Sequence, residues 1–402
     1  MREFELQNGI KSVYKKNNET PRMAITMNFS INEEEKFAGT YSLMTRLLLQ
    51  GTKTYNNEEL AKILDENGIE LIADMKQDYL RFRLLCLNED FPKALELLND
   101  IIRNSTFVEF DKEKVKMSGE LVAELDSARL KVSDAFVKTL YENHYYGHTY
   151  TNILESIDNI TKEHVTDSYN KIINTGKKVI AVVGSLEEDT VISLIEQYFS
   201  DLPNNNSAEK TYIAPTLDNS KRTEVIKEDA QQAQILQGWY APTYKEEDYP
   251  TMLCINTLLG ASGLSSRLFR ELREKKGLAY TVRTSIEVRE LASVFSIYIA
   301  TEPSNIETCL EGFKTEINKI KTELVSAEEL RNAKNNIDGK HQFIVETNFQ
   351  QSTSLAYYGI NGLPFGFYDV MHEKIEAVTP EQVLACANKY FNEKSVIAIL
   401  HP

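Results

Sequence analysis

The feature that most constrains the fold is a repetition of the first half of the chain in the second half. Three pairs of segments match in the same order: 62–71 with 271–280, 145–148 with 357–360, and 160–173 with 378–391. In the first pair, "KILDENGIEL" and "ELREKKGLAY" each hold a charged helix end, a glycine and the start of a strand. Self-similarity at about half of the 402 residues indicates two duplicated domains.

The pattern of apolar residues predicts what each copy contains. Alternating and continuous apolar runs predict strands at 9–16, 23–31 and 79–87, whereas apolar residues three and four apart predict helices at 39–50, 57–67, 92–104 and 111–142. The polar run "PNNNSAEK" at 203–210 is typical of a linker. We therefore expect an α+β protein with two homologous domains, 1–204 and 205–402, each a sheet with helices packed on one side.

Charge and hydropathy exclude two classes of partner. The formal charge of -15 would repel nucleic-acid phosphates and anionic membrane surfaces, so neither is expected as a partner, whereas a cationic or extended peptide is compatible with it. No window approaches the roughly 20 apolar residues of a membrane span, and no apolar run follows the charged amino-terminal residues. These observations predict a cytoplasmic protein.

The four cysteines do not form a recognisable framework. Cys86, Cys254, Cys309 and Cys386 are scattered singly, without a C-x-x-C pair. Such spacing gives neither a zinc knuckle nor a disulfide network, and we expect each cysteine to pack as a small apolar side chain.

Three stretches carry a resemblance to a known family. They are "AGTYSLMTRLLLQGT" (38–52), "VVGSLEEDTVISLIEQYFSDLP" (182–203) and "GLSSRLFRELREKKGLAYTV" (263–282). Their order and spacing resemble the insulinase or pitrilysin family of zinc peptidases, most closely the smaller members with two homologous domains per chain, such as the subunits of mitochondrial processing peptidase. The likeness runs over essentially the whole chain and implies that each domain has a mainly antiparallel sheet.

The first stretch keeps the frame of the family's inverted zinc motif but not its ligands. In H-x-x-E-H, two imidazoles at i and i+4 share a helix face and bind zinc, and the glutamate activates the water on the metal. This chain has Ser42, Thr45 and Arg46 at those three positions, and the resemblance places Glu120 about where the third ligand would lie. One carboxylate cannot replace three ligands, and arginine is a fixed cation, so the sequence predicts a degenerate site with no catalytic zinc.

The resemblance implies that a second constellation is retained. In the family the second domain contributes an arginine and, seven residues later, a tyrosine that bind the substrate, and Arg273 and Tyr280 have this spacing. A guanidinium and a phenol can donate hydrogen bonds to the oxyanion of peptide hydrolysis or to nearby carbonyls. Gly260 and Gly263 are expected in turns, because glycine is typical of turns. The resemblance further implies that they belong to a flexible loop that borders the substrate.

Other candidate sites are weaker. His144 and His148 have the i,i+4 spacing of a helical metal site, but Gly147 lies between them and tyrosines flank them, which indicates a helix end. No phosphate-binding glycine loop and no bracketed serine nucleophile is present.

The loss of one half of a peptidase site and the retention of the other half indicate a division of labour between two chains. We expect a non-catalytic subunit of a heterodimeric zinc peptidase, inactive alone, that acts on peptide substrates with a partner supplying the H-x-x-E-H motif and the zinc. The alternative is a structural or assembly subunit derived from a peptidase, which would have no use for Arg273 and Tyr280. A third possibility, an enzyme that works by itself, is not supported, because the sequence has no recognisable combination of nucleophile and base.

Overall fold

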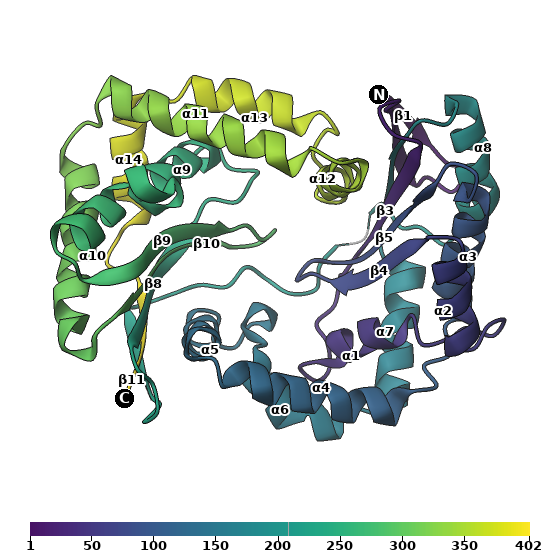
Figure 1. Cartoon of the computed structure of the whole chain (residues 1–402), viewed down its shortest axis with the longest axis horizontal. Coiled ribbons are helices and arrows are strands. Elements are labelled where there is room, and N and C mark those ends of the chain that lie inside the picture. The colour runs from purple at the N-terminus through teal and green to yellow at the C-terminus, as the bar shows by residue number, and fades with distance from the viewer. Residues whose placement is uncertain (208) are drawn as a thin grey trace. The chain divides into compact units, whose positions relative to one another are not determined.

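The computed structural model describes residues 1–207 and 209–402, and its contacts divide the chain into two compact units. The first unit holds residues 1–120, 152–212 and 342–367, and the second holds 121–151, 213–341 and 368–402. Each unit is an α+β assembly built around one sheet, which confirms the predicted fold class (Figure 1). The units are discontinuous in sequence, and the division into homologous domains 1–204 and 205–402 stays a prediction.

The sheet of the first unit has six strands in the order β1-β2-β6-β3-β5-β4. Only β2 and β6 are parallel among its pairs. Every residue of β6 is buried, which explains its continuous apolar run "KVIAVVG". The strands are β1 (Arg2–Glu5), β2 (Lys11–Lys16), β3 (Arg22–Ser30), β4 (Glu70–Met75), β5 (Tyr79–Leu87) and β6 (Lys178–Gly184).

The sheet of the second unit repeats this order with five strands, β7-β11-β8-β10-β9. Its one parallel pair, β7 with β11, corresponds to β2 with β6, and the remaining pairs are antiparallel as in the first unit. The duplication read from the sequence is therefore also a duplication of topology. The strands are β7 (Lys221–Ile226), β8 (Ala233–Ala241), β9 (Ala279–Glu287), β10 (Ser293–Thr301) and β11 (Val396–His401).

Helices cover the sheets. In the first half of the chain they are α1 (Thr40–Leu47), α2 (Asn57–Glu66), α3 (Phe91–Asn104), α4 (Phe110–Leu125), α5 (Ala128–Leu140), α6 (Tyr150–Ser156), α7 (Lys162–Thr175) and α8 (Glu188–Phe199). In the second half they are α9 (Tyr249–Asn256), α10 (Ile306–Thr322), α11 (Ala327–Ile344), α12 (Asn348–Ile360), α13 (Phe367–Glu376) and α14 (Pro380–Tyr390). Short 3₁₀ and π-helical turns, η1 (Tyr145–Gly147) to η6 (Pro303–Asn305), connect several of them.

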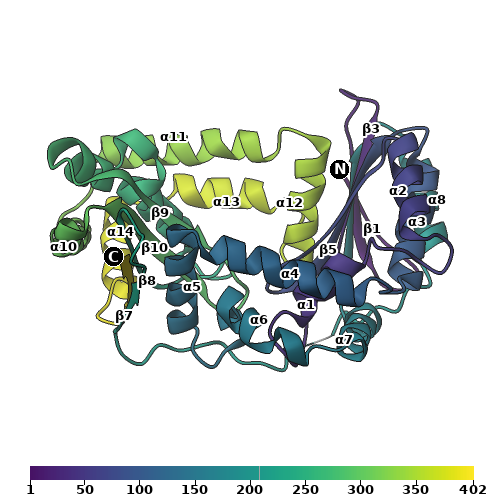
Figure 2. The same ribbon diagram turned by 60° about the horizontal axis from the view of Figure 1, so that its bottom comes forward.

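Each half of the chain gives one helix to the unit formed mainly by the other half. Helix α12 packs on β3, β5 and β6 of the first unit, on the face opposite α3 and α8 (Figures 1 and 2). Helix α5 packs on β7, β8 and β11 of the second unit. Periodicity places a residue on a helix but does not say which sheet the helix covers, so this exchange was not predicted.

The predicted helix at 111–142 is two helices. Helix α4 ends at Leu125 and α5 begins at Ala128, with Ser127 extended at φ -66° and ψ 118° as the residue before α5. Asp126 and Ser127 compete with the helical backbone for hydrogen bonds, which favours a helix boundary over a helix interior. The chain passes from one unit to the other just before this break, between Glu120 and Leu121 within α4.

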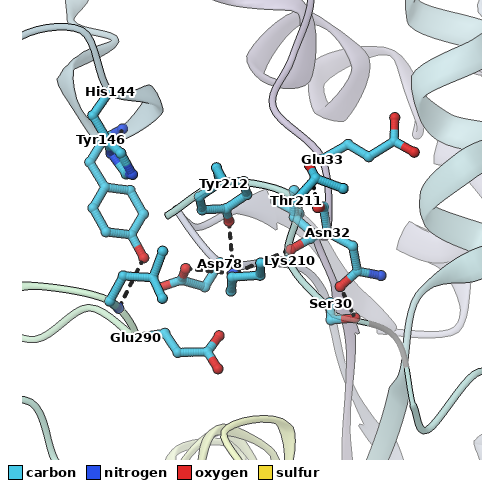
Figure 3. A network of polar contacts seen from close by, with 12 residues as sticks. Ser30, Asn32, Glu33, Asp78, His144, Tyr146, Lys210, Thr211, Tyr212 and Glu290 are labelled. Atoms are coloured by element: carbon cyan, nitrogen blue, oxygen red, sulfur yellow. Dashed lines mark hydrogen bonds and ion pairs between the residues drawn. The ribbon is translucent and has the colours of Figure 1, made fainter. Parts of the chain in front are cut away.

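The end of the predicted linker is fastened to the first unit. Lys210 Nζ donates to Asp78 Oδ1 at 2.8 Å and to the Tyr212 hydroxyl at 2.7 Å, and the Lys210 and Asp78 side chains are about nine-tenths buried (Figure 3). Thr211 N donates to the carbonyl of Asn32 at 2.8 Å. Residue 208, within the linker predicted at 203–210, lies outside the described residues.

All four cysteines are buried as free thiols, as expected. Burial raises the pKa of Cys86, Cys254 and Cys386 to about 12, so these side chains stay protonated and apolar at neutral pH.

Candidate functional site

Helix α1, which carries the degenerate motif, is fixed mainly by apolar packing. Leu43, Met44 and Leu47 are fully buried, as the apolar stripe predicts. The Glu35 carboxylate closes the amino-terminal end of the helix, because it accepts from the backbone N–H of Gly39 at 3.0 Å and of Tyr41 at 2.8 Å. These bonds satisfy N–H groups that a helix start leaves without partners.

The three positions of the degenerate motif have unlike surroundings. Thr45 is buried and donates its hydroxyl to the carbonyl of Tyr41 at 2.7 Å, a bond within its own helix. Ser42 is half-buried. Arg46 reaches across to α4, where its Nη1 lies 2.7 Å from Oε2 of Glu120. The structure thus brings Arg46 and Glu120 together.

In the second unit, Arg273 and Tyr280 also lie together. The Arg273 guanidinium lies 4.6 Å from the centroid of the Tyr280 ring and 4.6 Å from that of Phe269, so both rings contact it. Such cation–π contacts orient a guanidinium without neutralising its charge. Tyr280 is 78% exposed.

A register shift in the sheet explains the exposure of Tyr280. On β9, Val282 and Thr284 are buried, and strict alternation would place Tyr280 on the same buried face. The pairing with β10 instead runs from Thr281 directly to Ala279, which leaves Tyr280 as the extra residue of a bulge. A bulge changes the direction of a side chain, and here the extra residue is Tyr280, whose ring lies outside the core.

The turn before β9 follows from a glycine in left-handed conformation. The π-helical segment η5 (Phe269–Lys275) carries Arg273 and ends before Gly277, at φ 63°. Gly277 N donates to the carbonyl of Arg273, and Leu278 N donates to that of Leu272. The matching turn of the first unit has Gly68 at φ 57°, with bonds from Gly68 N to Asp65 and from Ile69 N to Leu64, each one residue shorter in span. The turn of the second unit is thus wider than that of the first, as expected after a π-helical segment.

The region of Gly260 and Gly263 is ordered turns rather than the loop that was expected. Gly260 lies in the π-helical segment η3 (Thr257–Ala261) and is buried, and a Cβ there would be 2.5 Å from the backbone nitrogen of Thr284. Gly260 therefore permits close packing of η3 on β9. Gly263 begins the 3₁₀ turn η4 (Gly263–Ser265) at φ 75°, with open space around it. A substrate-binding role for either glycine stays a prediction.

The histidine pair lies at a helix end, as its neighbours indicated. His144 precedes η1 and accepts at Nδ1 from the backbone N–H of Tyr146 at 3.0 Å, while its Nε2 lies 2.9 Å from the carbonyl of Ile213. Both nitrogens of His144 are thereby engaged by backbone groups. His148 follows η1 at its other end.

Family models match most of the chain. A family model described as "Insulinase (Peptidase family M16)" matches residues 11–156, and one described as "Peptidase M16 inactive domain" matches 159–337. The chain belongs to the insulinase family, M16. An uncharacterized zinc protease of Rickettsia felis is 29% identical to it over 378 residues, covering 92% of this chain and 89% of that protein. An uncharacterized zinc protease of Bacillus subtilis is 25% identical, covering 100% and 98%.

Solved structures show the same fold. A protease from Helicobacter pylori superposes on this M16 chain with a TM-score of 0.91 at 20% identity, covering 100% of this chain and 99% of that one. A peptidase M16 inactive domain from Pseudomonas fluorescens superposes with a TM-score of 0.90 at 22% identity, covering 100% and 97%.

The residues of this M16 chain do not fit the zinc that the family implies. Thr45 is committed to its own helix, and the cation of Arg46 occupies one carboxylate oxygen of Glu120. Within residues 1–207 and 209–402, no group of three or more His, Cys, Asp or Glu side chains is placed to hold a metal ion. At this place the structure has a partly exposed salt bridge between Arg46 and Glu120.

Sequence reasoning missed a polar cavity of about 590 Å³ in the second unit, bounded by η3, η5, α10 and α11. Its wall includes a two-bond ion pair in which Arg267 Nε and Nη2 each lie 2.7 Å from a Glu329 oxygen. The hydrogen bonds raise the pKa of Arg267 and lower that of Glu329, so both stay charged. Arg267 and Glu329 are 62 positions apart in the sequence, so their contact is visible only in the folded structure.

No helix in the part of the chain that the structure describes is both long and apolar enough to cross a membrane.

Proposed function

We propose that this chain is the non-catalytic subunit of a two-chain zinc peptidase and that it contributes Arg273 and Tyr280 to peptide hydrolysis at the zinc site of a partner. The partner would carry an intact H-x-x-E-H motif and would supply the metal and the base. This chain would bind and orient the peptide and donate hydrogen bonds to the developing oxyanion.

The observation that carries the proposal is the exposure of Tyr280 beside Arg273. Folding alone favours burial of a tyrosine ring, yet a bulge accompanies a ring that is 78% exposed, with the guanidinium of Arg273 4.6 Å from its centroid. A phenol and a guanidinium held in this way are donors ready for an anionic or carbonyl oxygen. The Arg46–Glu120 pair supports the other half of the proposal, because a chain that needed its own zinc would not place a cation there.

Reconstitution tests the proposal. The purified chain should cleave no unstructured peptide, and mixing it with an M16 chain bearing H-x-x-E-H, encoded in the same genome, should give activity that neither shows alone. Arg273→Ala should then lower kcat/KM by raising KM as well as lowering kcat, because the guanidinium also positions the peptide.

A control variant distinguishes the specific effect of removing Arg273 from the general effect of removing a positive charge. Arg331→Ala removes an exposed arginine of α11 that does not line the polar cavity of the second unit, and it should leave the complex fully active. If the complex assembles and Arg273→Ala hydrolyses peptide at the unmodified rate, this chain is an assembly subunit with no part in the chemistry.

A further inference from the structure

A second, smaller cavity lies beside α5 on the sheet of the second unit. Helix α5 covers β7, β8 and β11, and Gly238 of β8 leaves room for the ring of Phe136. Next to the helix, residues of β9 and β10 and the exposed edge of α5 enclose about 180 Å³. This volume suits one side chain rather than a cofactor, whose sites span about 300–1,000 Å³.

Two guanidiniums meet at this cavity. Arg129 of α5 and Arg283 of β9 each lie 5.5 Å from the centroid of the Tyr298 ring. Tyr298 is the direct cross-strand partner of Arg283, and its hydroxyl donates to the Gln234 side chain, which fixes the ring. A helix and a strand thus bring two like charges to one aromatic ring, and an anion bound between them would reduce their repulsion.

No internal carboxylate compensates these charges. Among the described residues, neither Arg129 nor Arg283 has an ion pair with an acidic side chain. Glu287 also lines the cavity, but its Oε1 accepts from Arg289 at 2.7 Å and 3.1 Å. The cavity therefore presents two exposed guanidiniums without a direct ion pair, beside a carboxylate that is bound to Arg289.

The sheet of the first unit offers a contrast. There Arg81 and Arg83 of β5 lie on the face covered by α12, and the guanidinium of Arg83 is 4.9 Å from the Phe349 ring. Asp74 of β4 lies between 2.6 and 2.9 Å from two Arg81 nitrogens and 3.5 Å from Arg83 Nε. Arginines on the sheet of the first unit thus share an internal carboxylate, whereas Arg129 and Arg283 of the second unit have no such ion pair.

We propose that Arg129, Arg283 and Tyr298 form a subsite for a carboxylate of the bound peptide. This inference rests on the proposed function in that a peptide is taken as the ligand. A guanidinium binds a carboxylate through two parallel hydrogen bonds, and the Ser133 and Ser296 hydroxyls at the cavity can complete the oxygens' partners. The carboxylate belongs either to an acidic side chain or to the carboxyl terminus of the peptide.

Binding measured on the purified chain, without a catalytic partner, tests the subsite separately from peptidase activity. The probes are four fluorescein-labelled decapeptides: one with a single internal glutamate, its glutamine twin, and both again with amidated carboxyl termini. We expect at least one carboxylate to strengthen binding by about 10-fold, the order of a charge-assisted hydrogen bond. Dependence on the internal glutamate identifies a side-chain subsite, and dependence on the free terminus identifies a terminal one.

The double variant Arg129→Gln/Arg283→Gln should bind all four peptides equally, with the affinity that the unmodified chain shows for peptides lacking the recognised carboxylate. The double lysine variant keeps both charges but loses the planar forks, so it should recover only part of the difference. Arg331→Gln should behave as the unmodified chain, and circular dichroism should show that all variants are folded. Equal affinity for all four peptides, undetectable binding of all of them, or discrimination that persists in the double glutamine variant would each overturn the subsite.

Discussion

At the scale of single residues, the decisive feature is the ion pair between Arg46 and Glu120. Arg46 lies in helix α1, and its ion pair with Glu120 connects α1 to α4. Both side chains are partly exposed, at 31% and 42%, so the pair stabilises the fold by only about 0–1 kcal/mol. Its importance is geometric, because it shows that Glu120 faces α1.

This geometry predicts that metal binding can be restored. The triple variant Ser42→His, Thr45→Glu, Arg46→His should bind zinc, since two imidazoles would share one face of α1 with Glu120 opposite. Isothermal titration with zinc should give one site per chain, and adding Glu120→Gln should weaken it by at least 10-fold. Turnover is a separate matter, because the groups that orient the ligands need not be present. Equal zinc affinity of the triple variant and the parent would show that the carboxylate is misplaced.

A second residue-scale prediction concerns Lys178, which is fully buried at the start of β6 and donates to the carbonyl of Gly176 at 2.8 Å. Burial lowers its pKa to about 8. Between about pH 8 and the unfolded value near 10.5, the unfolded chain binds more protons than the native one, so rising pH stabilises the native state.

Lys178→Met has no such proton to lose. Chemical denaturation at several pH values should therefore show that the stability of the variant relative to the unmodified chain falls as the pH rises from 8 to 10.5. A difference in free energy of unfolding that stays constant across this range would contradict the buried charge.

At the scale of elements, helix exchange and close packing define the units. The fit of α5 on its sheet depends on Gly238, where a Cβ would lie 2.6 Å from Phe136 Cζ and 2.8 Å from the carbonyl of Phe295. Gly119, on an exposed position of α4, is the matched control, because a Cβ there would have no neighbouring atom within 4 Å. The same substitution should thus have opposite effects at the two positions.

Gly238→Ala should lower the free energy of unfolding by about 1–3 kcal/mol through overpacking. Gly119→Ala should raise it by about 0.5–1 kcal/mol, because alanine is the better helix former and meets no neighbour. Urea titrations of both variants provide the measurement. A neutral Gly238→Ala would mean that α5 does not press on β8 as described.

At the scale of the whole molecule, the sequence predicted the duplication, the α+β class and the family. Apolar periodicity and matched motifs are local patterns that can be read along the sequence without the structure. The family resemblance also paired Arg273 with Tyr280, and the structure places the two side chains in contact. The sequence could not predict the exchange of α5 and α12, the bulge at Tyr280 or the meeting of Arg129 with Arg283. Each of these depends on which strand lies beside which element, and no local pattern encodes that.

The central claim is that a catalytic contribution remains in a chain without a metal site. Tyr280→Phe tests it most directly, because this change removes one hydroxyl from a ring that is 78% exposed and leaves the packing of the core untouched. In the reconstituted complex we expect kcat to fall by about 10²–10³, or roughly 2.7–4 kcal/mol, the range for loss of one oxyanion donor, while assembly is unchanged. An assembled complex whose kcat is the same with phenylalanine as with tyrosine would contradict the claim.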